Sequence, residues 1–99
     1  MQTEYLIAVN EICAHHNVEM SFIRSLQANG LLEVSTIEET SFIDAGQLRQ
    51  LEKFIRFYYE LDINLEGIET ITYLLQRITS LQDEITALKN RLRLYEETS

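Results

Sequence analysis

Proline and tryptophan are absent from this sequence, glycine occurs three times, and cysteine occurs once, as Cys13. A single cysteine excludes an internal disulfide framework and is typical of a protein from a reducing compartment. No apolar run approaches the ~18 residues that a membrane span needs, and the first residues lack the basic and apolar regions of a signal peptide. We therefore expect a cytoplasmic protein that makes no use of a membrane.

Basic residues are also scarce, and they are unevenly distributed. Sixteen acids against eight lysines and arginines give a net charge of −8, and residues 1–69 hold twelve of the acids but only four of the bases. Residues 70–99 hold four of each, so their balance is zero. Proteins that bind duplex DNA replace counterions with lysine and arginine, so this balance argues against a nucleic-acid partner. It suits a basic protein partner, or solubility alone.

The sequence contains no pattern typical of catalysis or of a bound cofactor. The three glycines stand alone, so there is no phosphate-binding loop, and no nucleophile elbow or histidine-centred triad occurs. Cys13 and His16, with His15 adjacent, have a spacing that can share a metal, but a closed zinc site needs four ligands and the chain has no other cysteine or histidine. The tyrosines that might act as acids or bases are better explained as core or interface aromatics: Tyr58, Tyr59 and Tyr73. We expect a protein that is not an enzyme and has no catalytic residues, metal or cofactor.

The first third of the chain has the pattern of two short helices joined by a tight turn. Residues 5–9 alternate as a short extended segment, and Asn10 is a suitable N-cap for a helix that carries Ile12, Cys13 and His16. Asn17-Val18 is typical of the turn, and Gly30 of the residue that ends the second helix. The second helix has apolar residues at helical spacing: Phe22, Ile23 and Leu26. This pattern predicts a helix-turn-helix.

A hairpin and a third helix are expected next. Residues 31–37 and 40–43 are rich in β-branched residues and flank Glu38-Glu39, which predicts a small hairpin, or wing, whose turn lacks the usual glycine. Asp44 and Gln47 have the spacing of a capping box. The third helix is expected to end near Leu61 and to have one broad apolar face: Leu48, Leu51, Phe54, Ile55 and Tyr58. Residues 62–64 form a short connector, with Asn64 as the next N-cap.

From about Leu65 to Tyr95 the chain has the pattern of one long helix with a heptad repeat. Isoleucine or leucine occupies the a positions and leucine or tyrosine the d positions, in the order Ile71, Leu74, Ile78, Leu81, Ile85, Leu88, Leu92 and Tyr95. At 1.5 Å per residue this seam is ~35 Å long, which a domain of residues 1–64 cannot cover. We therefore expect residues 65–99 to form a dimerisation helix. The charged pairs beside the seam fit a parallel or an antiparallel arrangement, so the orientation stays open.

The order of these elements resembles that of the MerR-like winged-helix proteins: helix-turn-helix, wing, third helix, connector and coiled coil. The residues that carry the resemblance are Ile12, Val18, Ile23-Arg24, Gly30-Leu31-Leu32, Leu51, Ile55 and Leu65-Glu66-Gly67-Ile68. The resemblance covers nearly the whole chain. It implies a mainly α fold, a MerR-like winged helix-turn-helix with a small β-hairpin wing and a long C-terminal coiled-coil helix.

Within that group the chain looks like the chaperone-modulator family CbpM. The supporting residues are Gly30 with Glu33, Ile37-Glu38-Glu39-Thr40 with Phe42, Glu60-Leu61, Gly67-Ile68, and a coiled coil that ends the chain almost at once. Val34 stands where the family often has proline, and Phe42 lies near a position where it has tryptophan, so this is a divergent member or a neighbour. The resemblance implies a cytoplasmic homodimer that binds the J domain of a DnaJ/CbpA-like co-chaperone and inhibits it.

Two acidic segments are the candidate contacts with that partner: the wing (Glu33, Glu38, Glu39) and the connector region (Glu60, Asp62, Glu66, with Glu69). DNA-binding MerR proteins carry basic residues in the recognition helix and wing, where phosphate contacts fix the register. Here the second helix has Arg24 alone, and residues 31–48 have no lysine or arginine. Arg49, Lys53 and Arg56 form a basic stripe on the third helix, which could make a residual phosphate contact. Pairing along the helix, of Arg49 or Arg56 with Glu52 and of Lys53 with nearby acids, is the favoured explanation. The alternatives are a MerR-like DNA-binding regulator and a dimerisation adaptor for another partner.

Overall fold

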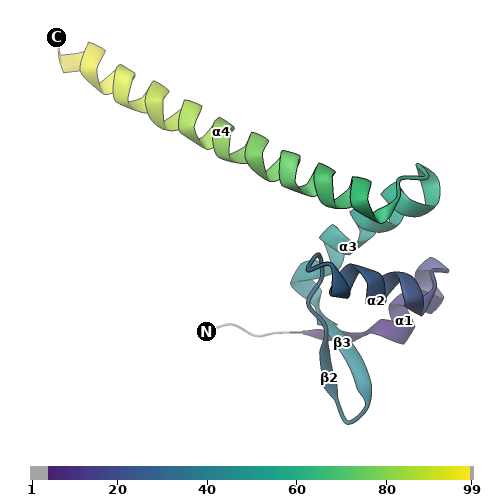
Figure 1. Ribbon diagram of the computed structural model, residues 1–99. Helices are drawn as coiled ribbons and strands as arrows, with labels where there is room; N and C mark the ends of the chain where they lie inside the picture. The colour runs from purple at the N-terminus through teal and green to yellow at the C-terminus, as the bar shows by residue number, and fades with distance from the viewer. Residues whose placement is uncertain (1–4, 99) are drawn as a thin grey trace. The chain divides into compact units, whose positions relative to one another are not determined.

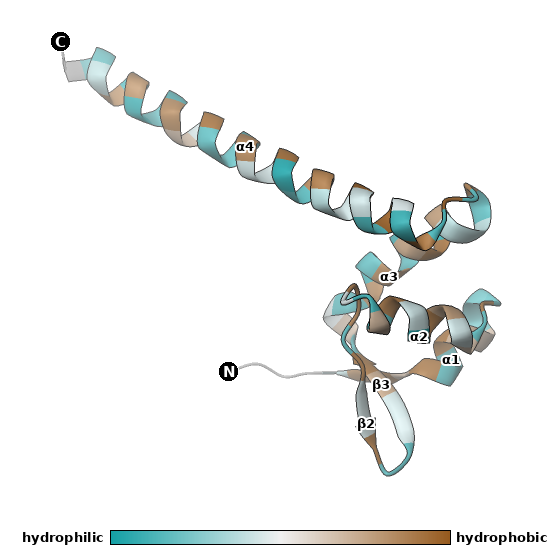
Figure 2. Ribbon diagram, viewed as in Figure 1, coloured by the Kyte–Doolittle hydropathy of each residue, from teal (hydrophilic) through white to brown (hydrophobic). Residues whose placement is uncertain are grey.

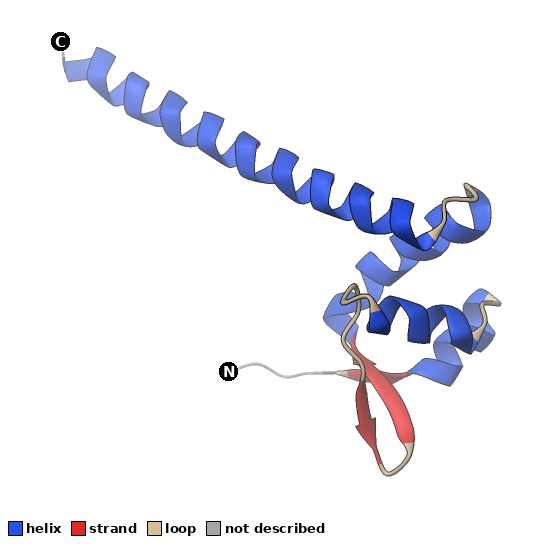
Figure 3. Ribbon diagram, viewed as in Figure 1, coloured by secondary structure: helices blue, strands red, loops and turns tan. Residues whose placement is uncertain are grey.

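A computed structural model describes residues 5–98. It is mainly helical with a small antiparallel sheet, which confirms the predicted winged helix-turn-helix with a long C-terminal helix (Figures 1 and 3). The chain divides into an N-terminal unit that ends at Glu69 and a C-terminal unit that begins at Thr70. In chain order the elements are β1 (Leu6–Ala8), α1 (Val9–His16), α2 (Met20–Ala28), β2 (Ser35–Ile37), β3 (Thr40–Asp44), the 3₁₀ turn η1 (Ala45–Gln47), α3 (Leu48–Ile55), the π-helical turn η2 (Arg56–Glu60) and α4 (Leu65–Thr98).

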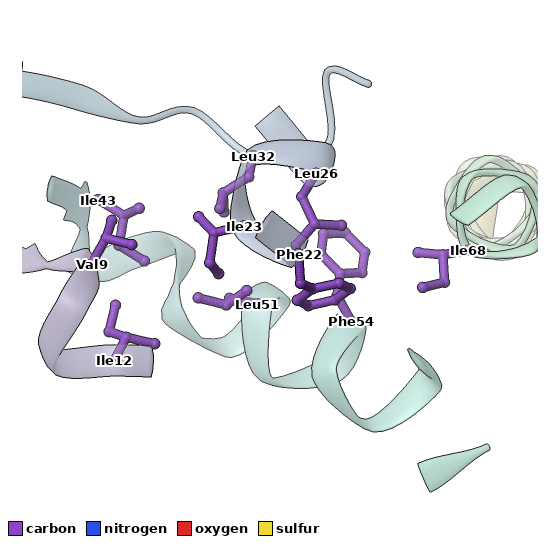
Figure 4. Close-up of a cluster of buried hydrophobic side chains, with 10 residues drawn as sticks. All are labelled: Val9, Ile12, Phe22, Ile23, Leu26, Leu32, Ile43, Leu51, Phe54 and Ile68. Carbon is purple, nitrogen blue, oxygen red and sulfur yellow. The ribbon is translucent and has the colours of Figure 1, made fainter. Parts of the chain in front are cut away.

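A single cluster of buried apolar side chains forms the core of the N-terminal unit (Figure 4). Helices α1, α2 and α3, strand β3, the loop between α2 and β2, and the first turn of α4 contribute to it: Val9, Ile12, Phe22, Ile23, Leu26, Leu32, Ile43, Leu51, Phe54 and Ile68. Ile68 is fully buried in this cluster. The N-terminal unit, which ends at Glu69, therefore includes the first turn of α4.

The turn between α1 and α2 and the end of α2 confirm the predicted helix-turn-helix. Asn17 closes α1 in the left-handed conformation with φ 58°, and the Val18 N–H donates to the Cys13 carbonyl at 3.0 Å. At the end of α2, Gly30 has φ +75° and its N–H donates to the Gln27 carbonyl, while the Leu31 N–H donates to the Leu26 carbonyl. These two bonds form a Schellman motif, which ends α2 at the predicted glycine.

Helix α1 does not begin at the predicted N-cap. Asn10 was expected to cap it, but the helix starts at Val9, with Ala8 in the cap position, and Asn10 lies exposed in the first turn. The reason is tertiary. Strand β1 pairs with β3 as far as Ala8, which lies opposite Phe42, and the buried Val9 then begins the helix directly.

The wing is part of a three-stranded antiparallel sheet with the order β1-β3-β2. Strand β1 pairs with β3 through Ile7 and Ile43, and β2 pairs with β3 up to Ile37 and Thr40. The two residues between them are the glutamates of the predicted turn. Glu38 has φ 51° and Glu39 has φ 67°, the positive values that a two-residue type I′ turn requires. The hairpin is thus confirmed, and its turn forms without a glycine.

The predicted capping box at Asp44 and Gln47 is wrong. Asp44 precedes η1 without a side-chain hydrogen bond to it. The Gln47 amide instead clasps the backbone of Glu33: its Nε2 donates to the Glu33 carbonyl at 2.8 Å, and its Oε1 accepts from the Glu33 N–H at 2.9 Å. The side chain that was expected to cap a helix therefore fixes the start of the wing.

Helix α3 continues without a break into the π-helical turn η2, which ends one residue before the predicted Leu61. The Leu61 N–H donates to the Arg56 carbonyl five residues earlier, the bond that defines a π turn. Asp62 then adopts φ 59°, and the connector leads to α4. The predicted N-cap at Asn64 is confirmed, because its Oδ1 accepts a 2.9 Å bond from the Gly67 N–H.

Helix α4 supplies the whole C-terminal unit. Apolar residues recur along it at the heptad spacing expected from the sequence (Figure 2). Among the helices that the structure describes, none combines the length and the apolar character needed to cross a membrane.

Candidate functional site

The three acids predicted for the wing are all exposed, and two of them form its tip. Glu38 and Glu39 are the central residues of the hairpin turn, and both are exposed. Glu33 precedes β2, and the Gln47 clasp fixes its backbone. Hydrogen bonds therefore order the backbone of all three acids: the Gln47 bonds at Glu33, and the β2–β3 pairing that flanks Glu38 and Glu39.

Glu39 also lines a hollow that it shares with the recognition helix. This hollow of about 180 Å³ lies between α2 and the wing and is lined by Arg24, Met20, Asn10, Glu39, Thr40 and Ser41. Arg24 is the one base of α2 and is exposed. An acidic residue thus lines the same hollow as Arg24. The negative charge of Glu39 disfavours binding of a DNA phosphate between the recognition helix and the wing, where DNA-binding winged-helix proteins contact the backbone.

The acids predicted for the connector are likewise exposed and lie at the junction of η2 and α4. Glu60 ends η2, Asp62 is the left-handed residue of the connector, and Glu66 lies in the first turn of α4. An acid in that turn interacts favourably with the positive end of the helix dipole. In the part of the chain that the structure describes, no ion pair neutralises Glu60 or Asp62.

The wing tip and the connector lie at opposite ends of the N-terminal unit (Figure 1). The hairpin turn projects beyond the sheet, whereas the connector lies at the far end of η2. The two predicted acidic segments are therefore two separate surfaces. One short segment of a partner does not contact both.

The basic stripe of α3 is not paired as expected. Arg49, Lys53 and Arg56 are exposed, and Glu52 pairs with His16 of α1 instead, with 3.7 Å between His16 Nε2 and Glu52 Oε2. The predicted pairing of Glu52 with Arg49 or Arg56 is therefore wrong. Glu52 faces α1 across the helix-turn-helix, a neighbour that the sequence spacing alone does not reveal.

Cys13 and the two histidines do not form a metal centre. Within residues 5–98 no three histidine, cysteine, aspartate or glutamate side chains gather closely enough to hold a metal ion. Cys13 is partly buried against the core, and this burial raises the pKa of its thiol. It therefore stays protonated at neutral pH, in the form that is a poor metal ligand and nucleophile.

The residues predicted for dimerisation lie on α4, and from Leu74 onward they are exposed in the single chain. Their exposed fractions lie between 41% and 59% for Leu74, Ile78, Leu81, Ile85, Leu88 and Leu92. A contiguous apolar stripe of this length is unusual on a monomer surface. It has the spacing of a coiled-coil seam, and the partner that covers it stays a prediction.

Sequence reasoning missed two features of the N-terminal unit. One is the Gln47 clasp, which joins residues fourteen apart and has no local signal. The other is the environment of Tyr58 and Tyr59, which lie partly exposed beside the connector acids. Two consecutive tyrosines before an acidic connector were the available signal, although core or interface packing explained them equally well.

Comparison with known proteins gives one match. A family model described as MerR HTH family regulatory protein matches residues 7–90. Searches of curated proteins and of solved structures found no match. The matched range begins in β1 and ends within α4, so it includes the helix-turn-helix, the wing and most of the long helix.

Proposed function

This chain belongs to the MerR HTH family of regulatory proteins, and we propose that within this family it acts as a chaperone modulator of the CbpM kind. It binds the J domain of a DnaJ/CbpA-like co-chaperone and inhibits the action of that co-chaperone with its DnaK-type chaperone. The mechanism is masking of a basic surface by a homodimer, with no nucleotide, metal or covalent step.

The observation that carries this proposal is the chemistry of the surface that would face a nucleic acid. Residues 31–48 contain no lysine or arginine, and the tip of the wing presents two glutamates. Glu39 lines the hollow between α2 and the wing together with Arg24. This surface repels phosphate and attracts a basic protein, such as the basic helix that J domains generally present to their chaperone.

Charge and apolar contact have different roles in such a complex. The net charge of −8 on residues 1–69 raises the rate of encounter with a basic domain, and salt screens this attraction. The residence time depends instead on a few well-packed contacts. Inhibition then follows from competition, because the J-domain surface covered by this protein is not accessible to the chaperone.

Calorimetric titration of the purified protein with a basic J domain from the same cell tests the proposal, at low and at moderate salt. We expect saturable binding whose affinity falls as the salt concentration rises. In a chaperone ATPase assay, stimulation of the ATPase rate by the co-chaperone should fall in proportion to the fraction of J domain bound. Absence of binding at both salt concentrations, with the dimer intact, contradicts the proposal.

A DNA-binding regulator is the second candidate, because Arg24 on α2 and the stripe of Arg49, Lys53 and Arg56 are all exposed. A dimer with this fold would bind a palindromic site. Mobility-shift titration with a random-sequence duplex and a pool of palindromes distinguishes the two functions. Tight, salt-sensitive binding to DNA favours the regulator, and its absence favours the modulator.

A further inference from the structure

The connector end of the N-terminal unit holds a cluster of three aromatic rings. Tyr58 and Tyr59 of η2 both contact Phe22 of α2, with ring centroids 4.7 Å and 5.3 Å from it, and their own centroids are 5.1 Å apart. Phe22 is buried, whereas Tyr58 is 37% exposed and Tyr59 is 42% exposed. The cluster thus has a buried base and two rings that reach the surface.

The π-helical turn explains how two consecutive tyrosines reach the same phenylalanine. Side chains of neighbouring residues diverge by about 100° in an α-helix, because it has 3.6 residues per turn. The wider π turn has more residues per turn, so Tyr58 and Tyr59 diverge less and both contact Phe22. Turns of this kind are frequent at functional sites.

Hydrogen bonds within the chain hold the Tyr59 ring and the connector in place. The hydroxyl of Tyr59 accepts a 3.2 Å hydrogen bond from the Glu19 N–H, and the Ile63 N–H donates to the Phe57 carbonyl at 2.9 Å. The first bond anchors the ring to the N-cap residue of α2, and the second folds the connector back against η2. A ring that is already ordered loses little side-chain entropy on binding.

Beside these rings lies a pocket of about 370 Å³ lined by Tyr58, Tyr59, Asp62, Ile63 and Asn64. Its volume is near the lower limit for small-molecule sites, and it suits one long side chain rather than a cofactor. Residues 57–69 around it contain four acids, Glu60, Asp62, Glu66 and Glu69, and no lysine or arginine. The pocket therefore has two tyrosines and an aspartate in its lining, within a segment that carries four acids and no base.

We infer that this pocket receives an arginine or lysine side chain from a basic helix of the partner protein. The inference rests on the proposed function and names the contact that anchors the partner. A cation over the face of a tyrosine is attracted by the ring quadrupole, and Asp62 on the pocket wall adds a carboxylate for the same charge. A second copy of this chain is the less suitable occupant, because the surrounding acids of two copies repel one another.

The wing has a different role in this arrangement. It lies at the opposite end of the N-terminal unit from the pocket (Figure 1), so its glutamates attract the partner without contacting the anchored helix. Loss of wing charge should therefore lower the association rate, whereas loss of a ring in the pocket should raise the dissociation rate.

The test compares Tyr58→Leu with its matched control Tyr58→Phe in binding to the J domain. Phenylalanine keeps the aromatic face, and leucine keeps only apolar contact with Phe22. We expect affinity to fall about 5- to 10-fold for leucine, through faster dissociation, and to stay within about 2-fold of wild type for phenylalanine. Thermal unfolding of both variants shows whether the leucine variant is folded. Equal affinities for the two folded variants overturn the inference and leave the proposed function standing.

A second measurement uses the wild-type protein and does not depend on the J domain. The probe is a synthetic amphipathic helix with arginine on one face, and the control is the same helix with neutral citrulline at those positions. We expect saturable shifts of the Tyr58 and Tyr59 ring resonances with the arginine helix alone. If these shifts occur but the J domain does not bind, the pocket binds arginine as inferred and the J domain is not the partner.

Two results overturn the inference in this second measurement: equal shifts with both helices, and shifts confined to the wing. A change in sedimenting mass of the Tyr58→Leu variant, measured separately, also overturns it. The last result would mean that the pocket is an interface between copies of this chain.

Discussion

The two central residues of the hairpin turn disfavour the backbone conformation that they adopt. Glu38 and Glu39 both adopt the left-handed backbone conformation, which costs an ordinary L-residue about 1–2 kcal/mol. Asparagine and glycine adopt it with less strain, and Asn-Gly is therefore frequent in such turns. Because the glutamates weaken their own turn, we expect their charges to be the property that matters.

The double substitution Glu38→Asn with Glu39→Gly tests this interpretation. Relief of backbone strain, reduced by the greater flexibility of glycine in the unfolded chain, should stabilise the protein by about 1 kcal/mol and raise its Tm by about 4–8 °C. Thermal unfolding followed by circular dichroism measures this change. The same variant should associate more slowly with a basic J domain because two charges are lost. A lower Tm would show that the glutamates make stabilising contacts.

At the scale of elements, the connection into α4 depends on close contact between Gly67 and the preceding turn as well as on the Asn64 cap. Ile63 and Ile68 occupy the N′ and N4 positions around the Asn64 cap, the positions of a hydrophobic staple. Between them, Gly67 lies so close to this turn that an added Cβ would be 2.7 Å from Ile63 Cγ2 and 3.2 Å from Asn64 Oδ1. A larger residue at position 67 therefore requires the Ile63 side chain to shift.

Gly67→Ala should destabilise the protein although alanine is the better helix former. Overlap with Ile63 should cost about 1–3 kcal/mol, which exceeds the gain of about 1 kcal/mol from helix propensity. Gly46→Ala is the control, because its Cβ would meet only the flexible carboxylate of Asp44, at 2.9 Å. Urea unfolding should show a change within about 0.5 kcal/mol for the control. Higher stability of Gly67→Ala would show that the contact relaxes freely.

At the scale of the whole molecule, charge and apolar surface are assigned to different units. The N-terminal unit carries the net charge of −8, and residues 70–99 are neutral overall but carry the exposed heptad stripe. An isolated helix of this kind is only marginally stable in water, so association through the stripe would also stabilise α4 itself. If the proposed partner contact and the proposed dimer both form, substitutions in one unit should alter one of them without altering the other.

Leu81→Glu with Leu88→Glu should convert the protein to a monomer. Two charges per chain at d positions would be buried without partners in a coiled coil. Sedimentation equilibrium should give the monomer mass, and helical circular dichroism should fall. The control, Thr79→Glu with Thr86→Glu, adds the same charge at b positions, away from the seam. A dimer that survives the leucine substitutions would place the interface elsewhere.

The features predicted correctly are those whose cause lies within a few residues of the chain. The Asn17 turn, the Gly30 end of α2, the Asn64 cap and the two-residue hairpin each depend on local backbone conformation or on a short hydrogen bond. The heptad stripe depends only on periodicity. The acidic surface could also be predicted, because charge is read directly from composition.

The incorrect predictions share a different cause. Asn10 does not cap α1, because β1 pairs with β3 as far as Ala8. Gln47 bonds the backbone of Glu33 instead of forming a capping box, and Glu52 lies beside His16 instead of pairing along its own helix. In each case a local partner competed with a distant one, and the fold brought the distant one closer. The same holds for the aromatic pocket, whose base, Phe22, lies on another helix.

We could therefore predict from the sequence the order of the elements, the ends of most helices, the sign of the surface charge and the stripe of α4. These depend on neighbours along the chain. The folded structure was needed to show that the wing and the connector are separate surfaces and that two tyrosines flank the connector pocket. Side chains choose their partners by distance in space, and that distance is set only when the core of the N-terminal unit has formed.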